Sequence, residues 1–343
     1  MGGHAGEEGT NLKSQGDRLK PRVFLSGILP PPALLPLQDG NFDLGWWEGD
    51  GILPRDVFQR EASRADGLVT FLSDQVDEEL LSQAPGLKIV ANVAVGYDNF
   101  DLAAATRRGV LLTNTPGVLT EATADLTFGL LLAAARRFGE GRRLLESGRW
   151  QAWYPLLLAG QEVHGATLGI IGLGRIGQAV AKRARGFGMR LVYWGRRPSA
   201  AAGDLGADFV PLRELLRQAD FVSIHCPLTP ETHHLLGREE LALLKPTAVL
   251  VNTARGAVVD QDALLEALKE GRIFAAGLDV FEEEPLPADH PLLLAPNVVA
   301  TPHLGSSTYL TRLRMAQMAV ANLVLGLAGE RPPNLLNPEG VKL

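Results

Sequence analysis

The sequence predicts an α/β protein with two doubly wound, parallel-sheet domains. The chain has 343 residues, whereas a single hydrophobic core stops growing near about 250 residues. Short apolar runs alternate with helical patterns along nearly the whole chain. The runs themselves are continuously apolar, which is typical of parallel strands that helices cover on both faces.

Ten apolar runs are predicted as strands, four in the first third of the chain and six after it. We expect each run to be a buried strand of a parallel sheet. The runs are RVFLSG (22–27), GLVTF (67–71), KIVANV (88–93), VLLTN (110–114), TLGIIG (167–172), LVYW (191–194), FVSIHC (221–226), AVLVN (248–252), IFAAGLDV (273–280) and VVAT (298–301).

Helical patterns with recognisable ends separate these runs. Thr120 and Glu121 begin an Ala- and Leu-rich pattern that can continue past Arg137. Asp260 precedes a helix that we expect to stop at Gly271, because aspartate is favoured before the first turn of a helix and glycine after the last.

The last long helical pattern runs roughly from Ser306 to Leu327 and begins far in sequence from the N-terminal strands. We see no repeat and no low-complexity linker, so we place a domain boundary in the long helix after Pro116. The most apolar stretch, Leu126 to Ala135, is about half the length that a membrane span needs. It is therefore predicted as a buried helix.

The composition argues against several classes of protein. A hydrophobic content of 46% with 21% charged residues is typical of a soluble globular protein. A formal net charge of -6, without a run of Lys or Arg, favours neither nucleic acid nor a membrane surface as a partner. The single cysteine, Cys226, excludes an intrachain disulfide and cysteine-based metal sites, so we assign no metal and expect a cytoplasmic protein. Residues 1–20 are Gly-rich and polar and are expected to form a disordered tail.

A glycine loop lies in the segment TLGIIGLGRIGQAVAK, with Gly172, Gly174 and Gly177 in the spacing G-x-G-x-x-G. The first glycine allows a tight turn, the second lets a pyrophosphate approach the backbone, and the third lets the helix pack closely on the strand. Free N–H groups at the helix N-terminus then face the anion. With a strand before it, a helix after it and a second strand about 20 residues on, the loop predicts a dinucleotide site.

The residues after that second strand bear on the choice of dinucleotide. The strand normally ends in Asp or Glu, which binds the ribose hydroxyls of NAD. Here the position falls near Gly195, followed by Arg196 and Arg197. Two guanidinium groups can hold a 2′-phosphate, so NADP(H) is the expected cofactor and NAD(H) the alternative. Two other interpretations stay open: solvated surface arginines, or an arginine that stacks on adenine without discriminating.

Three later segments carry side chains suited to carbonyl reduction. NTARGAVVD contains Arg255, LDVFEEEP contains Asp279 and Glu284, and TPHLGSS contains His303. In an open α/β sheet the carboxyl ends of the strands converge on the cofactor crevice, so these side chains are expected to meet there.

A 2-keto acid reductase needs a proton donor, a cation for the carboxylate, and a group that keeps the donor charged. His303 is the candidate donor because imidazole titrates near neutral pH. Glu284 would favour the imidazolium form, and Arg255 would bind a carboxylate at two points. Each has a plain structural alternative: a histidine that caps a helix, a solvated glutamate, and an arginine in a turn.

Six motifs in order resemble the D-isomer-specific 2-hydroxyacid dehydrogenases, most closely their glyoxylate/hydroxypyruvate reductase branch. The resemblance covers about residues 21–337. The motifs are AVGYDN (94–99), GLGRIG (172–177), HCPLTPET (225–232), NTARG (252–256), LDVFEEEP (278–285) and TPHLGSST (301–308).

The resemblance implies a catalytic set of Arg255, Glu284 and His303. It also implies a substrate site in which the backbone near Val95 and Gly96 holds the carboxylate beside Arg255. The cofactor would contact the glycine loop and the residues around it. The remaining positions implied are Leu72 and Ser73 for substrate, and Thr123, Arg175, Ile176, Cys226, Pro227, Leu228, Thr232, Thr253, Ala254, Asp279, His303 and Gly305 for cofactor.

Two of these assignments have open alternatives. The thiol of Cys226 is interpreted as a small buried group, with its backbone making any contact. Thr123 either reaches the nicotinamide or caps a turn.

The family fold implies a Rossmann cofactor domain, residues 120–301, inserted into a flavodoxin-like substrate domain of residues 21–119 and 302–337. The segment 142–155 resembles the family's dimer arm, and its aromatic residues Trp150, Trp153 and Tyr154 are expected to bury against a second subunit. Trp153 is the candidate to border the partner's active site, with plain interface packing as the alternative. A homodimer is therefore expected.

The resemblance implies NAD(P)H-dependent reduction of glyoxylate and hydroxypyruvate to glycolate and D-glycerate, with His303 as proton donor. Two alternatives remain: a D-lactate or broader 2-keto acid reductase, and a dinucleotide-sensing binding protein that resembles the corepressors of this fold. Turnover of glyoxylate would separate an enzyme from a binding protein.

Overall fold

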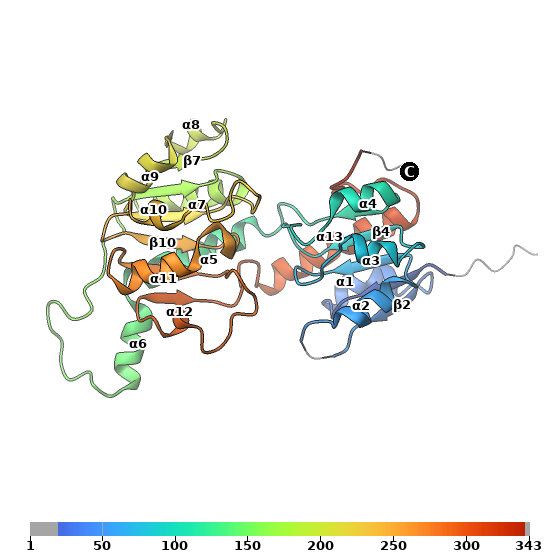
Figure 1. The fold of residues 1–343 in the computed structure, drawn as a ribbon, viewed down its shortest axis with the longest axis horizontal. Helices are drawn as coiled ribbons and strands as arrows, with labels where there is room; N and C mark the ends of the chain where they lie inside the picture. Colours follow the sequence, from blue (N-terminus) through green and yellow to red (C-terminus); the bar gives the residue numbers. More distant parts are fainter. Residues whose placement is uncertain (1–19, 50, 340–343) are drawn as a thin grey trace, which may run out of the picture.

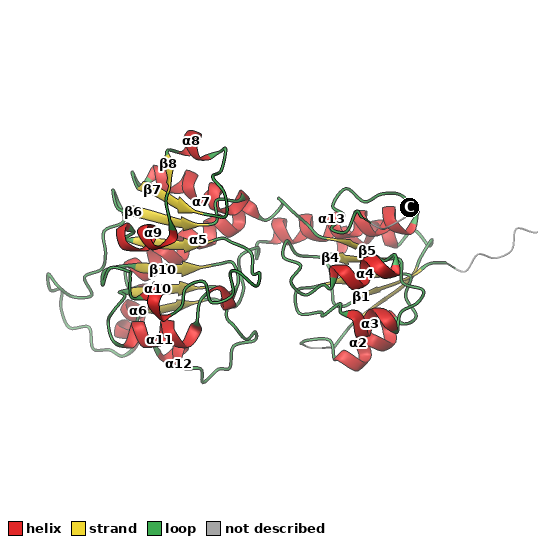
Figure 2. Ribbon diagram, turned by 45° about the horizontal axis from the view of Figure 1, so that its top comes forward, coloured by secondary structure: helices red, strands yellow, loops and turns green. Residues whose placement is uncertain are grey.

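The computed structural model describes residues 20–49 and 51–339. Apart from Lys20, the predicted N-terminal tail lies outside these residues. Two parallel sheets form two separate bodies, one built from the early strands and one from the late strands (Figure 1). Helices, red in Figure 2, cover the faces of the yellow strands.

The described residues form strands and helices in the alternation that the sequence predicts. The strands are β1 Arg22–Leu25, β2 Asp43–Trp46, β3 Gly67–Thr70, β4 Ile89–Asn92, β5 Leu111–Thr113, β6 Thr167–Ile171, β7 Arg190–Trp194, β8 Ala207–Phe209, β9 Phe221–Ile224, β10 Val249–Asn252, β11 Ala275–Leu278 and β12 Val298–Ala300. The α-helices are α1 Pro31–Leu34, α2 Arg55–Ala62, α3 Glu78–Ser82, α4 Leu102–Arg108, α5 Thr120–Ala135, α6 Phe138–Glu146, α7 Arg175–Gly186, α8 Ala202–Leu205, α9 Leu212–Gln218, α10 Arg238–Leu241, α11 Gln261–Lys269, α12 Pro291–Leu294 and α13 Tyr309–Leu327; Leu35–Leu37 and Gly256–Val258 are 3₁₀ helices.

The first sheet has the order β2-β1-β3-β4-β5, and the second has the order β12-β11-β10-β9-β6-β7-β8. Every strand pair is parallel. The first order is that of flavodoxin-like sheets, and the second is a doubly wound sheet whose order reverses between β6 and β9. The predicted fold class, two doubly wound α/β domains, is confirmed.

Both faces of each sheet are buried, as the continuous apolar runs predicted. In β4, Ile89 and Ala91 join one core cluster and Val90 joins the cluster on the opposite face. In β6, Ile170 and Ile171 divide between the two clusters of the second domain in the same way. Successive side chains of a strand point to opposite faces, so an apolar residue at every position means that neither face meets water.

Strands β2 and β8 were not predicted. Both are edge strands, and their side chains are mostly exposed or half-buried. An edge strand needs no continuous apolar run because one side of its ladder faces solvent. The signal that identified the central strands is therefore missing from these two.

The helix that begins at Thr120 does not continue past Arg137, although its sequence pattern allows it. α5 ends at Ala135, and Arg137 has φ +55°, the left-handed region, before α6 begins. Gln161 N donates to the Ala135 carbonyl oxygen at 2.9 Å, and a Cβ on Gly160 would lie 2.1 Å from that oxygen. The returning chain thus caps α5, and this contact has no local sequence signal.

The two later helices begin and end with the predicted chemistry. Asp260 accepts the N–H of Ala263 at the start of α11, and Gly271, with φ +70°, follows its last turn. α13 begins at Tyr309, three residues later than the approximate start at Ser306, because the side chain of Thr308 accepts an N–H as its N-cap.

α13 packs on β3, β4 and α1, although the whole second sheet separates it from them in sequence. The second sheet is therefore inserted between β5 and α13. Figure 1 shows α13, in orange-red, with the blue and teal strands of the first domain. Within residues 20–49 and 51–339, no helix combines the length and the apolar character that crossing a membrane requires.

Candidate active site

The glycine loop lies at the carboxyl end of β6, beside the point where the strand order reverses. Gly172 has φ +96°, and a Cβ there would lie 2.7 Å from the backbone nitrogen of Cys226. A Cβ on Gly177 would lie 2.2 Å from the carbonyl oxygen of Gly172, so α7 packs directly on the turn. Around Gly174 a Cβ would meet no atom within 4 Å. The three glycines thus provide the turn, the open approach and the close helix packing that a pyrophosphate loop requires.

The N-terminus of α7 completes this cradle. Arg175 is its first residue, and among the described residues no side chain caps this end of the helix. Its first N–H groups remain available to an anion, as the helix dipole favours. Ile176 is half-buried and packs against core clusters of both domains, so its side chain links the domains while its backbone lies in the loop.

The segment after β9 lines the other side of the switch point. Cys226 is buried, and burial raises the pKa of its thiol to about 11. The hydroxyl of Thr232 donates to the Pro227 carbonyl oxygen at 2.6 Å and accepts the N–H of Thr229 at 2.8 Å. Thr232 therefore shapes the turn that carries Pro227 and the half-buried Leu228.

β7 ends at Trp194, and Gly195 follows it directly. The Trp194 carbonyl oxygen accepts the N–H of Gly172 at 2.8 Å, which places the end of β7 beside the glycine loop. Arg196 and Arg197 are both exposed. Neither forms an ion pair within 4.0 Å with a carboxylate of the part of the chain that the structure describes. Two guanidinium groups thus stand where a carboxylate would normally follow the strand.

Arg255 follows β10 in a turn that a buried asparagine shapes. The side chain of Asn252 donates to the Arg255 carbonyl oxygen at 2.8 Å and accepts the N–H of Ala254 at 3.0 Å. The next residue is Gly256, where a Cβ would lie 1.8 Å from the carbonyl carbon of Phe281. This close approach brings the arginine turn against the loop that carries Glu284.

Asp279 follows β11, and its buried carboxylate holds the loop that carries His303. Its Oδ1 accepts the Thr301 hydroxyl and the Leu304 N–H, each at 2.6 Å, and its Oδ2 accepts the Gly305 N–H at 2.8 Å. Burial raises the pKa of this carboxyl above its usual value, although these donors oppose the shift. His303 itself has φ +53°, so the bonds to Asp279 maintain a backbone conformation that is unfavourable for histidine.

The imidazole of His303 and the carboxylate of Glu284 meet as predicted, with Nδ1 and Oε2 2.7 Å apart. The other carboxylate oxygen accepts the N–H of Phe281 at 3.0 Å. Burial acts to raise the pKa of Glu284, but the hydrogen bond and charge of His303, the Phe281 N–H and the charge of Arg255 outweigh it and lower the pKa below its usual value. Glu284 therefore stays ionised and can hold the imidazole ring by Nδ1, which leaves Nε2 to face a substrate.

Arg255 also reaches the first domain. A Cβ on Gly96 would lie 1.6 Å from its Nη2, so the guanidinium rests directly on the loop after β4. Its Nε and Nη2 each lie 2.9 Å from Oδ1 of Asp98. The predicted neighbours Arg255 and Gly96 thus meet, and half-buried Val95 lies next to them in the chain.

Leu72 and Ser73 lie in the turn after β3, which is bonded to the same loop. Asn99 donates to the carbonyl oxygens of Phe71 and Asp74 at 3.2 and 2.8 Å. The Asp74 carboxylate accepts the N–H of Phe71 at 2.7 Å, so it fixes the turn from within. The structure therefore brings the Leu72–Ser73 turn beside the loop that carries Gly96.

Two threonines of α5 bond to segments that carry predicted cofactor-binding residues. Thr123 Oγ1 donates to the Gly305 carbonyl oxygen at 3.0 Å. The hydroxyls of Thr127 and Thr253 lie 2.9 Å apart. Thr123 thus bonds to the loop after His303 and does not cap a turn of its own.

Trp153 is the one predicted site residue that the structure does not bring to the others within the described chain. It follows α6 in a segment that projects from the second domain, away from the first (Figure 1), and it is 75% exposed. Contact with an active site would have to come from another subunit.

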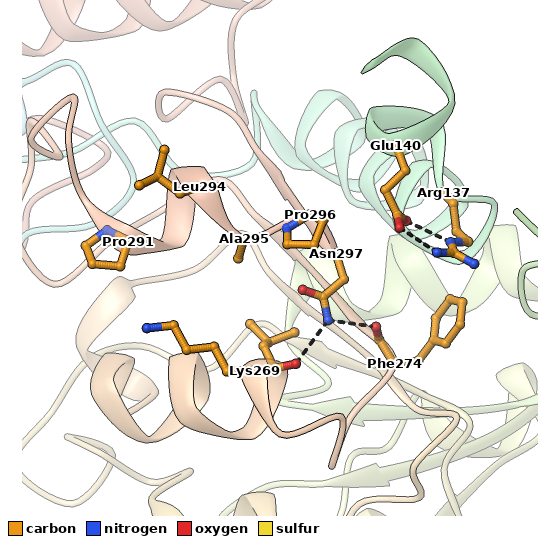
Figure 3. Close-up of a pocket in the computed structure, with 10 residues that line it drawn as sticks. Arg137, Glu140, Lys269, Phe274, Pro291, Leu294, Ala295, Pro296 and Asn297 are labelled. Atoms are coloured by element: carbon orange, nitrogen blue, oxygen red, sulfur yellow. Dashed lines mark hydrogen bonds and ion pairs between the residues drawn. The ribbon is translucent and has the colours of Figure 1, made fainter. Parts of the chain in front are cut away.

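A pocket on the second domain (Figure 3) lies apart from the triad. It has a volume of about 560 Å³ and lies at the amino ends of β11 and β12, at the opposite edge of the sheet from the glycine loop. Arg137 and Glu140 face each other on one wall, 2.6 Å apart. Leu294, which is 75% exposed, lies on the other wall beside Ala295. Because catalytic residues gather at the carboxyl ends of strands, this pocket is not the candidate active site.

Sequence reasoning missed Asp98, Asn252 and Asn99. Asp98 and Asn99 lie in the motif AVGYDN, but nothing in the motif shows which domain their side chains face. Asn252 is at the end of a strand, where a polar residue after an apolar run is a signal that could have identified it.

The chain matches the family model for the D-isomer specific 2-hydroxyacid dehydrogenase, NAD binding domain, over residues 128–305. It is 51% identical over 327 residues to a glyoxylate reductase of Korarchaeum cryptofilum, covering 95% of this chain and 98% of that protein.

Solved structures agree in fold. The TT0316 protein of Thermus thermophilus has a TM-score of 0.87 and 51% identity, covering 92% of this chain and 99% of that one. An NADPH-dependent glyoxylate/hydroxypyruvate reductase of Sinorhizobium meliloti, in complex with NADP and malonate, has a TM-score of 0.81 and 34% identity, covering 94% and 98%. The chain therefore belongs to the D-isomer specific 2-hydroxyacid dehydrogenases, a family of oxidoreductases that use a nicotinamide dinucleotide.

Proposed function

We propose that this enzyme reduces glyoxylate and hydroxypyruvate to glycolate and D-glycerate. The observation that carries the proposal is the hydrogen-bonded pair His303–Glu284 on a crevice that Arg255 also borders. The relatives named glyoxylate reductase, such as the Korarchaeum protein, support the choice of substrate. The proposal includes roles for three residues, Arg255, Glu284 and His303.

His303 donates the proton in this mechanism. Glu284 accepts a hydrogen bond from Nδ1–H, which orients the ring so that Nε2–H faces the substrate's keto oxygen. Arg255 and the N–H groups near Val95 and Gly96 hold the carboxylate, so the keto carbon is fixed before reaction. When bound, the reduced nicotinamide supplies the hydride.

The dinucleotide is held, in this proposal, by the glycine loop and the segments around it. The cradle at Gly174 and the free N-terminus of α7 suit the pyrophosphate. Asp279 retains one lone pair on Oδ2 after the loop bonds described above, which suits a carboxamide N–H. Thr253, Ala254, Thr123 and Gly305 border the same region.

We propose NADPH as the preferred cofactor. Arg196 and Arg197 are exposed beside the end of β7, where no carboxylate follows to repel a 2′-phosphate. The Sinorhizobium reductase, which was solved with NADP, supports this choice. If NADH gives an equal kcat/KM for glyoxylate, the cofactor proposal is wrong while the reductase proposal stands.

The test of function is a set of initial rates on glyoxylate, hydroxypyruvate and pyruvate, each with NADPH and NADH. We expect the first two substrates to be reduced with kcat/KM above that for pyruvate. His303→Gln should lose about 10²- to 10⁴-fold in kcat and retain dinucleotide affinity. Tight dinucleotide binding with no turnover of any 2-keto acid would instead indicate a binding protein.

A further inference from the structure

Among the described residues, Asp98 is the only carboxylate that forms an ion pair with Arg255. This ion pair joins the two domains. Asp98 follows β4 of the first sheet, whereas Arg255 follows β10 of the second. The carboxylate oxygen Oδ1 lies 2.9 Å from both Nε and Nη2 of the arginine. The arginine side chain is 21% exposed and the aspartate 39% exposed, so the pair is only partly screened by water.

The contact occupies one edge of the guanidinium and leaves another edge available. Asp98 takes the Nε and Nη2 side, and Nη1 donates to the Ala254 carbonyl oxygen at 2.8 Å. A guanidinium has five N–H donors in a rigid fork. Three are engaged by these contacts, so Nη1 and Nη2 each keep one N–H for which no described residue is an acceptor. A substrate carboxylate can therefore bind while Asp98 stays in place.

Both ends of the pair are anchored in their own domains. On the first domain, Asn92 donates to the Gly96 carbonyl oxygen at 3.2 Å and to Asn99 Oδ1 at 3.3 Å, which fixes the loop on either side of Asp98. On the second domain, Asn252 holds the backbone of the Arg255 turn. The absence of a Cβ at Gly96 lets the guanidinium lie against the loop.

We propose that Asp98 is a positioning residue, which aligns the Arg255 fork for the carboxylate of the 2-keto acid across the domain boundary. An arginine side chain has several rotatable bonds, and freezing it costs free energy that would otherwise weaken substrate binding. The contacts of Arg255 with Asp98 and with the Ala254 carbonyl already order its side chain before substrate binds, so little further ordering is needed. The inference rests on the proposed function, since it assigns the orientation of a residue in the same site.

The alternative is that Asp98 competes with substrate for Arg255. Competition and positioning predict opposite changes in KM when Asp98 is replaced. A competitor that is removed lowers KM, whereas a positioning residue that is removed raises it. The geometry favours positioning, because the aspartate binds one edge of the fork and leaves donors on the other.

The experiment compares Asp98→Asn and Asp98→Ala with Asp125→Asn. Asp125 forms an ion pair with Arg183 on the surface of the second domain, 2.6 Å apart, so it controls for loss of an aspartate–arginine pair. We expect both Asp98 variants to raise KM for glyoxylate by roughly tenfold or more. Their dinucleotide Kd and Tm should stay close to the values of the parent, and the control should change none of these.

A double-mutant cycle with Arg255→Ala tests whether the effect acts through the arginine. In that background Asp98→Asn should have no further effect on KM or on binding of oxalate, a non-reducible carboxylate probe, measured by calorimetry with NADP⁺ bound. An unchanged or lower KM in Asp98→Asn, or an equal loss of oxalate affinity with and without Arg255, would overturn the proposal.

The oxalate measurement also separates the two proposals from each other. If the parent enzyme turns over no 2-keto acid, the proposed function fails, and the oxalate affinities still decide whether Asp98 positions Arg255. If the parent protein with NADP⁺ binds no oxalate, Arg255 does not hold a carboxylate and the positioning proposal fails.

Discussion

At the scale of single residues, the candidate site consists of side chains whose neighbours determine their state. Glu284 lies between an imidazole and a backbone N–H, so its carboxylate form is favoured despite partial burial. Cys226 lies in an apolar core with no such partner charge, so its thiol form is favoured. Burial thus has opposite outcomes for the two groups, because only one has donors that stabilise its anion.

Glu284→Gln tests the ionisation of the pair. The folded-state pKa of Glu284 lies below its usual value of 4.5, so its carboxylate stabilises the fold at pH values above about 4.5, and this contribution is lost as the pH falls through the folded-state pKa. The parent should therefore have a higher Tm than the Gln variant at pH 7, and the difference should shrink as the pH falls below 4.5. Thermal unfolding from pH 3 to 7 measures this. A Tm difference that does not depend on pH would contradict the assignment.

Cys226 should resist thiol reagents in the folded protein. A pKa of about 11 leaves about a hundredfold less thiolate at pH 8 than a cysteine with a pKa of 9, and the thiolate is the nucleophile. Labelling with a thiol-reactive dye at pH 8 should be slow in buffer and rapid in guanidinium chloride. Labelling at the rate of an exposed cysteine under native conditions would show that the thiol is accessible.

At the scale of elements, the central strands were predictable and the edges were not. β4 and β6 are apolar at consecutive positions because helices cover both faces. This requirement can be read from the local sequence. β2 and β8 are edge strands and do not need to be apolar at every position. The break between α5 and α6 depends on Gly160 and Gln161, which come back to Ala135 from a later part of the chain, and a local pattern cannot show such a contact.

The catalytic candidates were predictable for the same physical reason as the strands. Arg255, Glu284 and His303 each follow a predicted strand, and the carboxyl ends of parallel strands share one edge of the sheet. Asp98 was not predictable in this way. Its contact with Arg255 depends on how the two domains pack together, and the strand pattern of neither domain shows that.

The loop that carries His303 should depend on Asp279. In Asp279→Asn one carboxylate oxygen, an acceptor, becomes an amide NH₂. This NH₂ would face the N–H or O–H donors that the oxygen now accepts, leaving them unpaired. We expect a loss of about 1–3 kcal/mol in the free energy of unfolding and a lower kcat, because His303 is no longer held in its left-handed backbone conformation. Denaturant unfolding and steady-state rates measure both.

Thr301→Val is the matched control for this loop. It removes only the hydroxyl bond to Asp279 and leaves the two backbone N–H bonds intact. Its losses in stability and kcat should be smaller than those of Asp279→Asn. Equal losses in the two variants would show that the backbone bonds to Asp279 do not position the loop.

At the scale of the whole molecule, insertion of the second domain means that two chain segments connect the domains, one between β5 and α5 and one between β12 and α13. α5 belongs to the second domain, where it packs on α7, β10 and β11, and α13 belongs to the first. Thr123 on α5 bonds to Gly305, which lies just before α13, so a hydrogen bond joins α5 to the second connecting segment.

The arm after α6 should join two copies of the chain. α6 has no buried residue among those described, and Trp150, Trp153 and Tyr154 are 55%, 75% and 56% exposed. Three large aromatic side chains exposed together on a projecting segment are typical of an interface core. We therefore expect a homodimer in solution.

Replacing Trp150, Trp153 and Tyr154 together with Ala should convert that dimer into a monomer. Because these side chains contribute no core packing within one chain, each domain should keep its secondary structure, and the loss should be confined to assembly. Light scattering coupled to size-exclusion chromatography at micromolar concentration gives the mass directly. Tyr309→Ala, which removes an aromatic that is 70% exposed on another element, is the control and should leave the dimer intact. A triple variant with the mass of the parent would show that the arm does not hold the subunits together, whereas a monomeric variant with reduced kcat would also indicate that the arm contributes to the partner's site.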